Sequence, residues 1–336
     1  MHYEIAIVGA GMAGLICGKT LQEAGRDVVV IDKSRGLGGR LATRRLANTH
    51  ADHGVCYLKP KGDRFRAFIQ DLADRNIVSL WSDRLHTLVD GELILDPDPS
   101  PRYAAPKGAT AIAKDLAQGL TLELGQVINA IYPIDQGWQL TSQNPDFDLT
   151  ASIVILAIPA PQALPLIQAI VNPEFIQQIE GVTFAPSLTA IAAYSPELRS
   201  QFTATNLRGI TCKDEILGWI GFDSTKQVNP TQPTMIIQSN AKFAATYFDT
   251  TDLPTIAQQL CDRAAEVLRF PWIATPESLQ IQRWKYAFAL NPVNAPVLAA
   301  TTAAPLFCIG DWCGGNRVES ALLSGLAMAE RLGYLQ

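Results

Sequence analysis

The sequence predicts an α/β protein with two domains, and three observations lead to this fold class. The chain has 336 residues, which corresponds to about two domains at roughly 150 residues each. Residues 5–32 read as strand, glycine-rich turn, helix and strand, the pattern of a parallel βαβ unit. Residues 181–290 hold alternating apolar runs at 188–194, 218–222 and 235–239, which predict an antiparallel sheet, with a helix over 253–268.

Composition excludes several classes of protein. With 48% hydrophobic and 18% charged residues, the chain is neither disordered nor of low complexity. A net charge of −5 argues against nucleic acid or an anionic membrane as the main partner. The six cysteines contain no CxxC pair, and no targeting segment is visible, so a reduced, cytoplasmic location is expected. Residues 149–173 and 286–310 carry no charge, but both contain several prolines and are expected to form buried strands and turns rather than membrane spans.

The first chemical motif is the turn Gly9-Ala10-Gly11-Met12-Ala13-Gly14, between the strand at 5–8 and the helix at 13–24. Gly9 permits a tight turn, Gly11 lets the backbone approach a pyrophosphate, and Gly14 allows close packing of helix on strand. The helix N-terminus offers free N–H groups to phosphates. Asp32 ends the next strand, where a carboxylate can bind a ribose diol. This Rossmann-type context predicts dinucleotide binding, without separating NAD from FAD.

A basic, glycine-bearing loop follows at residues 33–45. Its segment Arg35-Gly36-Leu37-Gly38-Gly39-Arg40 combines guanidinium groups suited to phosphate with glycines that allow a close approach to a ligand. A solvated basic loop is the alternative interpretation. Directly after a βαβ unit, this loop favours FAD bound in an extended form.

A third motif lies near the C-terminus, where a strand at 306–309 runs into Gly310 and Asp311. The Asp311 carboxylate is placed to accept a hydrogen bond from a ribityl hydroxyl. Beyond Arg317, a helix begins near Val318, and its N-terminus is suited to stabilising negative charge on a reduced flavin ring. An ordinary helix cap by Asp311 or Asn316 is the alternative.

A metal site and hydrolytic chemistry are both disfavoured. His50, Asp52, His53 and Cys56 include ligand types used by zinc, but no second cluster completes a ligand set, so no metal is expected. The sequence has neither a GxSxG elbow nor an HExxH motif. The chemistry is therefore expected to come from the cofactor.

Together these motifs resemble the flavin-dependent amine oxidase superfamily, and more closely its renalase-like branch. The resemblance spans most of the chain and rests on VGAGMAG (8–14), IDKSRGLGGRLATRR (31–45), ADHGVCYL (51–58), ILAIPAPQA (155–163), RWKYA (283–287) and IGDWCGGNRVESALLSG (309–325). It implies a p-hydroxybenzoate-hydroxylase-like fold, non-covalent FAD, and oxidation of a dihydronicotinamide dinucleotide, NAD(P)H or its abnormal isomers. Hydride would pass to flavin N5 without a dedicated protein base, and oxygen would become hydrogen peroxide.

The expected domains are discontinuous. Residues 1–50, 106–165 and 292–336 are assigned to FAD binding, and residues 51–105 and 166–291 to the substrate. Val127, expected in a strand over 121–128, resembles the family valine at the adenine end. The expected cofactor contacts are Gly9, Gly11, Met12, Ala13, Gly14, Asp32, Lys33, Arg35, Gly39, Arg40, Gly54, Val55, Cys56, Val127, Asp311, Arg317 and Val318.

The expected pocket residues are Trp284, Tyr57 and Cys56. The family pattern D-x-G-x-Q-Y matches at Asp52, Gly54 and Tyr57, but Cys56 replaces the usual glutamine. A thiol is a far weaker hydrogen-bonding group than an amide, so contacts beside the flavin are expected to differ. Two alternative functions stay open: oxidation of amines or another small organic donor, and a non-catalytic flavin-binding role.

Overall fold

The computed structural model describes residues 1–333, which divide into two compact units. Unit 1 comprises residues 1–41, 112–184 and 288–333 of the described chain, and unit 2 comprises residues 42–111 and 185–287. From the sequence, the four points at which the chain passes from one domain to the other were expected near residues 50, 105, 165 and 291. The assignment of one unit to the cofactor and the other to the substrate stays a prediction.

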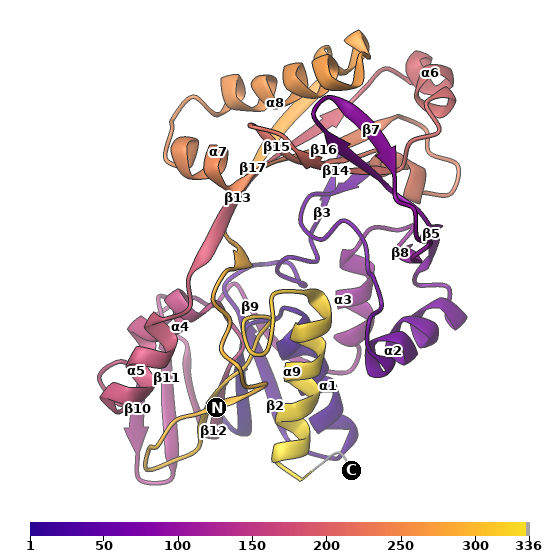
Figure 1. The fold of residues 1–336 in the computed structure, drawn as a ribbon. Helices are drawn as coiled ribbons and strands as arrows, with labels where there is room; N and C mark the ends of the chain where they lie inside the picture. The colour runs from indigo at the N-terminus through magenta and orange to yellow at the C-terminus, as the bar shows by residue number, and fades with distance from the viewer. Residues whose placement is uncertain (334–336) are drawn as a thin grey trace. The chain divides into compact units, whose positions relative to one another are not determined.

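Unit 1 is built on an eight-stranded mixed sheet with a parallel core (Figure 1). Its central strand β1 pairs in parallel with β2 and β12, so that Ile7 lies opposite Val30 on one side and Ile155 on the other. The hairpin β10–β11 extends the sheet as antiparallel strands. The strands are β1 (His2–Val8), β2 (Val28–Asp32), β9 (Thr121–Leu124), β10 (Ile128–Ile134), β11 (Gly137–Ser142), β12 (Asp148–Leu156), β18 (Leu298–Ala299) and β19 (Leu306–Cys308).

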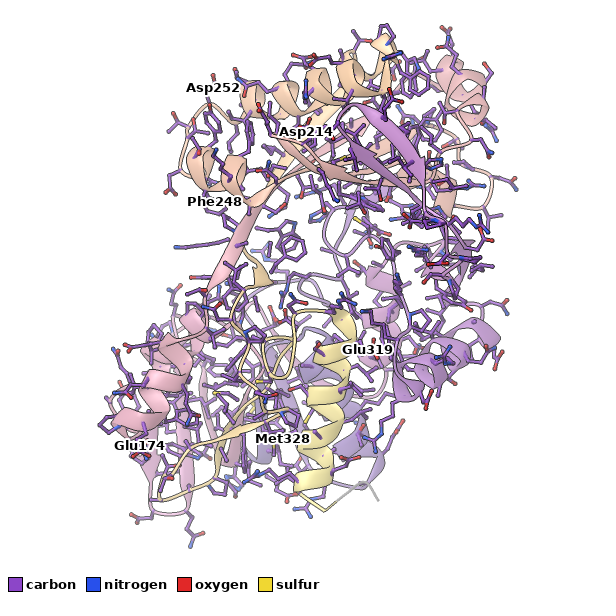
Figure 2. All side chains as sticks on the ribbon, viewed as in Figure 1. Glu174, Asp214, Phe248, Asp252, Glu319 and Met328 are labelled. Carbon is purple, nitrogen blue, oxygen red and sulfur yellow. The ribbon has the colours of Figure 1, made fainter. Side chains whose placement is uncertain are left out.

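Two helices of unit 1 pack closely on each other beside this sheet (Figure 1). Helix α9 (Val318–Arg331) meets α1 (Met12–Glu23) at Gly325, where a Cβ atom would lie 2.5 Å from the Ala13 carbonyl oxygen. Met328, labelled in Figure 2, is completely buried on α9. The other helices here are α4 (Ala160–Ile167), α5 (Pro173–Glu180) and α3 (Thr110–Leu116), which begins in unit 2. The glycine turn thus leads into a helix fixed by close contacts.

Unit 2 is built on a seven-stranded sheet in the order β17-β13-β16-β15-β14-β6-β7. The pair β14–β6 is parallel, whereas the pairs β13–β16, β16–β15, β15–β14 and β6–β7 are antiparallel. Its strands are β6 (His86–Val89), β7 (Glu92–Leu95), β13 (Phe184–Ala193), β14 (Gly209–Lys213), β15 (Leu217–Gly221), β16 (Thr234–Ser239) and β17 (Ser278–Ala289). Short pairs β3 (Thr43–Arg45) with β4 (His50–Asp52), and β5 (Ser79–Ser82) with β8 (Arg102–Ala104), lie outside this sheet.

Helix α8 (Leu253–Leu268) packs on the unit 2 sheet and confirms the helix predicted over 253–268. Asp252 caps its N-terminus by accepting a hydrogen bond from the Thr255 amide, and Asp214 forms an ion pair with Arg263 of the same helix (Figure 2). The remaining helices are α2 (Asp63–Asp74), α6 (Arg199–Ala204), α7 (Ala241–Tyr247), and the 3-10 turns η1 (Pro196–Leu198), η2 (Asp223–Lys226) and η3 (Pro271–Ala274).

The α/β fold class is confirmed, and one strand assignment is wrong. The sequence predicts a continuous strand over 121–128, but β9 ends at Leu124. Gly125 has a φ of +76° and turns the chain, so that Val127 lies in the connection before β10. Among residues 1–333, no helix is both long and apolar enough to cross a membrane.

Candidate functional site

The glycine turn of unit 1 leaves room in front of the first turn of α1. A Cβ atom on Gly9, whose φ is +118°, would lie 2.5 Å from the Ala157 carbonyl oxygen, and one on Gly14 would lie 2.0 Å from the Gly9 oxygen. These two positions therefore require glycine. Gly11 differs, because a Cβ atom there would meet nothing within 4 Å. Gly11 is also the N-cap of α1 and provides no side chain, so the amides of the first helical turn are not capped by a side chain.

Asp32 organises this turn from the end of β2. One carboxylate oxygen accepts the Ala10 amide and the other accepts the Ser34 amide, each at 2.7 Å. A carboxylate oxygen has two lone pairs, so both atoms keep acceptor capacity for a ligand hydroxyl. Asp32 therefore holds the turn and remains available to a ribose.

The basic loop lies against the glycine turn. The Gly38 amide donates to the Ala10 carbonyl at 2.8 Å, and Gly38 forms a parallel bridge with Gly11. Gly38 has a φ of +103°, and its absent side chain allows this approach. Lys33 and Arg35 are exposed on the same loop. The loop therefore brings cationic side chains into the neighbourhood of the N-terminus of α1.

Arg40 and Asp311, predicted separately, form a bidentate ion pair within unit 1. Arg40 Nη1 donates to Asp311 Oδ2 at 2.7 Å, and a second contact joins Nη2 to Oδ1. The Asp311 side chain is 6% exposed and that of Arg40 is 30% exposed. Arg317 is the N-cap of α9 and makes no side-chain cap, so the amides of the first turn at Val318 are not capped by that residue.

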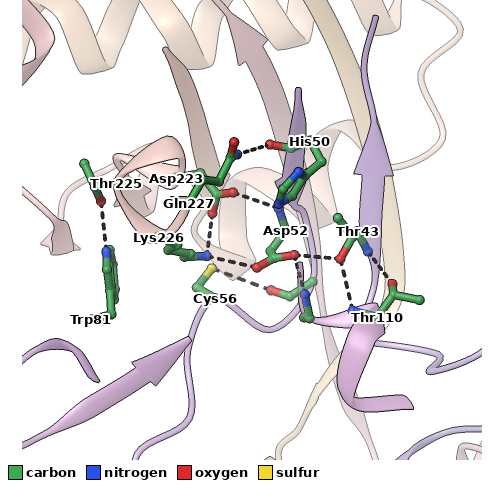
Figure 3. Close-up of polar contacts among 12 residues, drawn as sticks. Thr43, His50, Asp52, Cys56, Trp81, Thr110, Asp223, Thr225, Lys226 and Gln227 are labelled. Carbon is green, nitrogen blue, oxygen red and sulfur yellow. Dashed lines mark hydrogen bonds and ion pairs between the residues drawn. The ribbon is translucent and has the colours of Figure 1, made fainter. Parts of the chain in front are cut away.

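In unit 2, residues 50–57 are anchored by a buried charge cluster (Figure 3). Asp52 accepts hydrogen bonds from the Thr43 hydroxyl at 2.7 Å and from the Ala109 amide at 2.8 Å. Lys226 lies 3.4 Å from Asp52 and also pairs with Asp223, whose other oxygen accepts the Asp52 amide. Burial raises the pKa of Asp223, against the opposing effect of Lys226. The cluster fixes the end of β4.

Trp284 of β17 contacts the predicted segment at His53. The two rings stack with centroids 5.4 Å apart and an interplanar angle of 20°, and Trp284 Nε1 donates to the His53 carbonyl at 2.8 Å. Burial, followed by the charge of Arg44, lowers the pKa of His53 to about 4. His53 is therefore uncharged at neutral pH, and the structure brings Trp284 and this segment together as a stacked pair of neutral rings.

Cys56 and Tyr57 lie elsewhere in the same unit. Tyr57 packs against Trp219 at 5.4 Å and Trp81 at 6.2 Å, within a small apolar cluster. Cys56 Sγ donates to the Gly54 carbonyl at 3.6 Å, and burial raises the pKa of its thiol to about 12. Cys56 is therefore a protonated thiol with no nucleophilic character at neutral pH.

The sequence analysis missed Lys226, Asp223, Arg44 and Gln282. An isolated lysine in a short 3-10 turn gives no motif, and only the fold brings Lys226 to Asp52. Arg44 belongs to the basic loop by sequence but lies on β3, where its Nη2 donates to Gln282 at 3.0 Å. From the sequence, the segment that contains His53 was expected to form a flavin-facing strand or turn continuing from the basic loop rather than a metal site. Among residues 1–333, no group of three or more potential ligands is placed to hold a metal.

Comparisons with known proteins agree with this fold. A family model described as an NAD(P)-binding Rossmann-like domain matches residues 7–72, and one described as flavin containing amine oxidoreductase matches residues 78–333. A putative flavin-containing monoamine oxidase AofH of Mycobacterium tuberculosis is 35% identical over 69 residues, which is 20% of this chain and 15% of that protein. An L-amino-acid oxidase of Siganus canaliculatus is 37% identical over 71 residues, 20% of this chain and 14% of that protein.

Solved structures resemble the chain over almost its whole length. A putrescine oxidase bound to putrescine has a TM-score of 0.73 at 13% identity and covers 99% of both chains. A putative protoporphyrinogen oxidase from Exiguobacterium sp. has a TM-score of 0.73 at 12% identity, with 98% of each chain covered. At such low identity these likenesses show the fold alone.

The fold and the family match define an FAD-dependent oxidoreductase by class. The chain belongs to the flavin-containing amine oxidoreductase family. The residues present fit FAD, because a Cβ atom at Gly11 would meet no protein atom within 4 Å, the first turn of α1 has no side-chain cap, and Asp32 keeps spare acceptor capacity. The residues of unit 1 that we propose would hold it are Gly9, Gly11, Met12, Ala13, Gly14, Asp32, Lys33, Arg35, Gly39, Arg40, Val127, Asp311, Arg317 and Val318. The contacts expected at Gly54, Val55 and Cys56, which belong to unit 2, stay a prediction from the sequence.

Proposed function

We propose that this chain is an FAD-dependent oxidase that acts on a dihydronicotinamide dinucleotide, either NAD(P)H or one of its abnormal isomers, in the manner of the renalase-like branch. FAD, when bound, accepts the hydride of the donor and passes the electrons to oxygen, giving hydrogen peroxide. The protein's part is to bind and orient the donor and to exclude water.

The observation that carries this proposal is the stack of Trp284 on a neutral His53. A flat aromatic face is suited to a dihydropyridine ring, which can lose a hydride without prior loss of a proton. An alkyl amine, by contrast, is protonated at neutral pH and has to lose that proton before oxidation. With a pKa of about 4, His53 is a poor base for this purpose.

Oxidation of an amine is the second candidate, since the chain shares its family and fold with amine oxidases. The aromatic residues Tyr57, Trp81 and Trp219 lie together in unit 2 and are the natural source of an apolar cage. However, Trp81 and Trp219 are each only 8% exposed and pack within an apolar cluster. This packing favours a structural role for the three rings.

Anaerobic titration of the holoenzyme tests the proposal. The flavin absorbance is followed while the 2- and 6-dihydro isomers of NAD(P)H, ordinary NAD(P)H, or a simple amine such as putrescine are added. We expect bleaching by the dihydronicotinamides and formation of hydrogen peroxide on admission of air. Bleaching by the amine alone would establish the second candidate, and a flavin that no donor reduces would point to a non-catalytic flavin-binding role.

A further inference from the structure

Arg44 carries a positive charge that forms no ion pair with any carboxylate of residues 1–333. Within residues 1–333 the structure gives it one side-chain partner, the amide oxygen of Gln282, at 3.0 Å from Nη2. Its Nε is enclosed by protein and lacks an acceptor. The nearest acidic residue in sequence, Asp52, forms an ion pair with Lys226 and accepts hydrogen bonds from the Thr43 hydroxyl and the Ala109 amide. Arg44 is half-buried, and a partly desolvated guanidinium without a counter-charge favours a negative partner.

His53 supplies a second unpartnered polar group beside Arg44. Its side chain belongs to a residue that is only 7% exposed, and its Nδ1 is enclosed without a hydrogen-bond partner. The charge of Arg44 contributes to the lowered pKa of His53, which shows that the two groups interact electrostatically. A neutral imidazole still donates one N–H, from whichever ring nitrogen carries the proton.

One strand face gathers these groups. Gln282 and Trp284 are two residues apart on β17 and therefore point to the same side of the strand. Gln282 holds Arg44, and Trp284 stacks on His53. Arg44 Nη1 has no hydrogen-bond partner within the described chain and is not among its enclosed atoms, so the outer edge of the guanidinium is free to bind a ligand.

The geometry points to an oxyanion subsite in unit 2, in which Arg44, fixed by Gln282, and His53 bind a phosphate or carboxylate group of the substrate next to Trp284. The assignment to a phosphate rests on the proposed function, because a dihydronicotinamide dinucleotide carries a diphosphate close to its nicotinamide riboside. A fixed guanidinium fork is well matched to an oxyanion, since little side-chain entropy is lost on binding. The same charge repels an ammonium group.

The subsite is tested on the holoenzyme by titration calorimetry with ADP-ribose as the diphosphate probe and acetate as the carboxylate probe. We expect Arg44→Met to weaken ADP-ribose binding at least about tenfold, because a charge-assisted hydrogen bond is lost. Arg44→Lys should restore part of the affinity, and His53→Leu should weaken binding less than Arg44→Met. Arg45→Met is the matched control, since Arg45 is exposed on the next position of β3, and it should change affinity less than about twofold.

Thermal unfolding gives a second readout that does not depend on turnover. Saturating ADP-ribose should raise the unfolding temperature of the wild type and of Arg45→Met, but not of Arg44→Met. If acetate binding depends on Arg44 and ADP-ribose binding does not, the subsite is retained and its ligand is a carboxylate. If the affinity for both probes is the same in Arg44→Met as in the wild type, the proposed subsite is wrong. Arg44-dependent binding in an enzyme that no dihydronicotinamide reduces would refute the proposed function alone.

Discussion

Arg40 and Asp311 form a bidentate ion pair across 271 positions of sequence, and this pair joins the basic loop to the segment between β19 and α9. The sequence analysis assigned the two residues to different parts of one ligand, Arg40 to the phosphates and Asp311 to the ribityl chain. Their pairing means that each orients the other within unit 1. A change at either position therefore affects both stability and cofactor retention.

Arg40→Met should lower the free energy of unfolding of the apoprotein by about 1–3 kcal/mol, because Asp311 keeps a buried charge without a partner and Arg40 is itself partly exposed. Chemical denaturation measures this loss. The double variant Arg40→Met/Asp311→Asn should be less destabilised than the sum of the single changes. Additive losses would show that the two side chains do not interact.

Cofactor retention should fall in Arg40→Ala and also in Asp32→Ala, whose carboxylate holds the Ala10 amide at 2.7 Å. Retention is measured by the flavin absorbance that remains after gel filtration. Full occupancy in both variants would contradict the placement of the dinucleotide in unit 1. Lys19→Ala, on the partly exposed side of α1, is a suitable control and should retain FAD.

Two glycines of the same turn should respond in opposite ways to alanine. Gly14→Ala would place a Cβ atom 2.0 Å from the Gly9 carbonyl oxygen, so it should destabilise or unfold unit 1. Gly11→Ala meets no protein atom within 4 Å at an extended backbone position, so the apoprotein should keep its stability. Its FAD affinity should nevertheless fall, because the methyl group occupies the space left for the pyrophosphate. Circular dichroism measures the effect on folding, and FAD titration measures the effect on binding. Normal FAD affinity in Gly11→Ala would show that the pyrophosphate does not lie beside Gly11.

Much of unit 1 was predictable because its determinants are local. A glycine turn, an apolar strand and an acidic residue at the end of β2 identify themselves by spacing alone. The interactions that orient the candidate site were not predictable, since Arg40 meets Asp311 and Trp284 meets His53 over separations of 271 and 231 positions. Val127 shows the limit even locally, because a single left-handed glycine at 125 ended a strand that the apolar pattern continued.

Cys56→Gln should keep FAD and change donor preference. The thiol is protonated and makes one long contact to the Gly54 carbonyl, whereas an amide adds both a donor and an acceptor. The ratio of kcat/KM for the dihydronicotinamide isomers to that for NAD(P)H is the quantity to compare. Cys56→Ser, which adds a small polar group of similar size, serves as the control for packing. An unchanged ratio in Cys56→Gln would exclude Cys56 from the substrate site.

Lys226→Met should destabilise unit 2 strongly. The Lys226 side chain is 2% exposed, and its removal leaves the carboxylates of Asp52 and Asp223 buried without a counter-charge, at a cost of about 3–5 kcal/mol. In the variant the Asp223 carboxylate loses the opposing effect of Lys226 and is expected to protonate more readily, so the deficit relative to wild type should shrink as the pH falls. Lys242→Met, at an exposed position of α7, should unfold like the wild type at every pH. A Lys226→Met deficit that does not vary with pH would contradict this account of the cluster.

His53 should make the protein less stable as the pH falls from about 6.5 toward 4. The pKa of the buried side chain is lowered from 6.5 to about 4, mainly by burial and secondly by Arg44, with Asp52 opposing. Between these pH values the unfolded chain binds the proton and the folded chain does not. The free energy of unfolding therefore decreases as the pH decreases, by at most about 3 kcal/mol. Urea denaturation at several pH values should show a shallower decline in His53→Gln, while His2→Gln, an exposed control, should follow the wild type. Parallel wild-type and His53→Gln curves would mean that folding does not lower the pKa of His53, and would remove the argument from a poor base on which the proposed function rests.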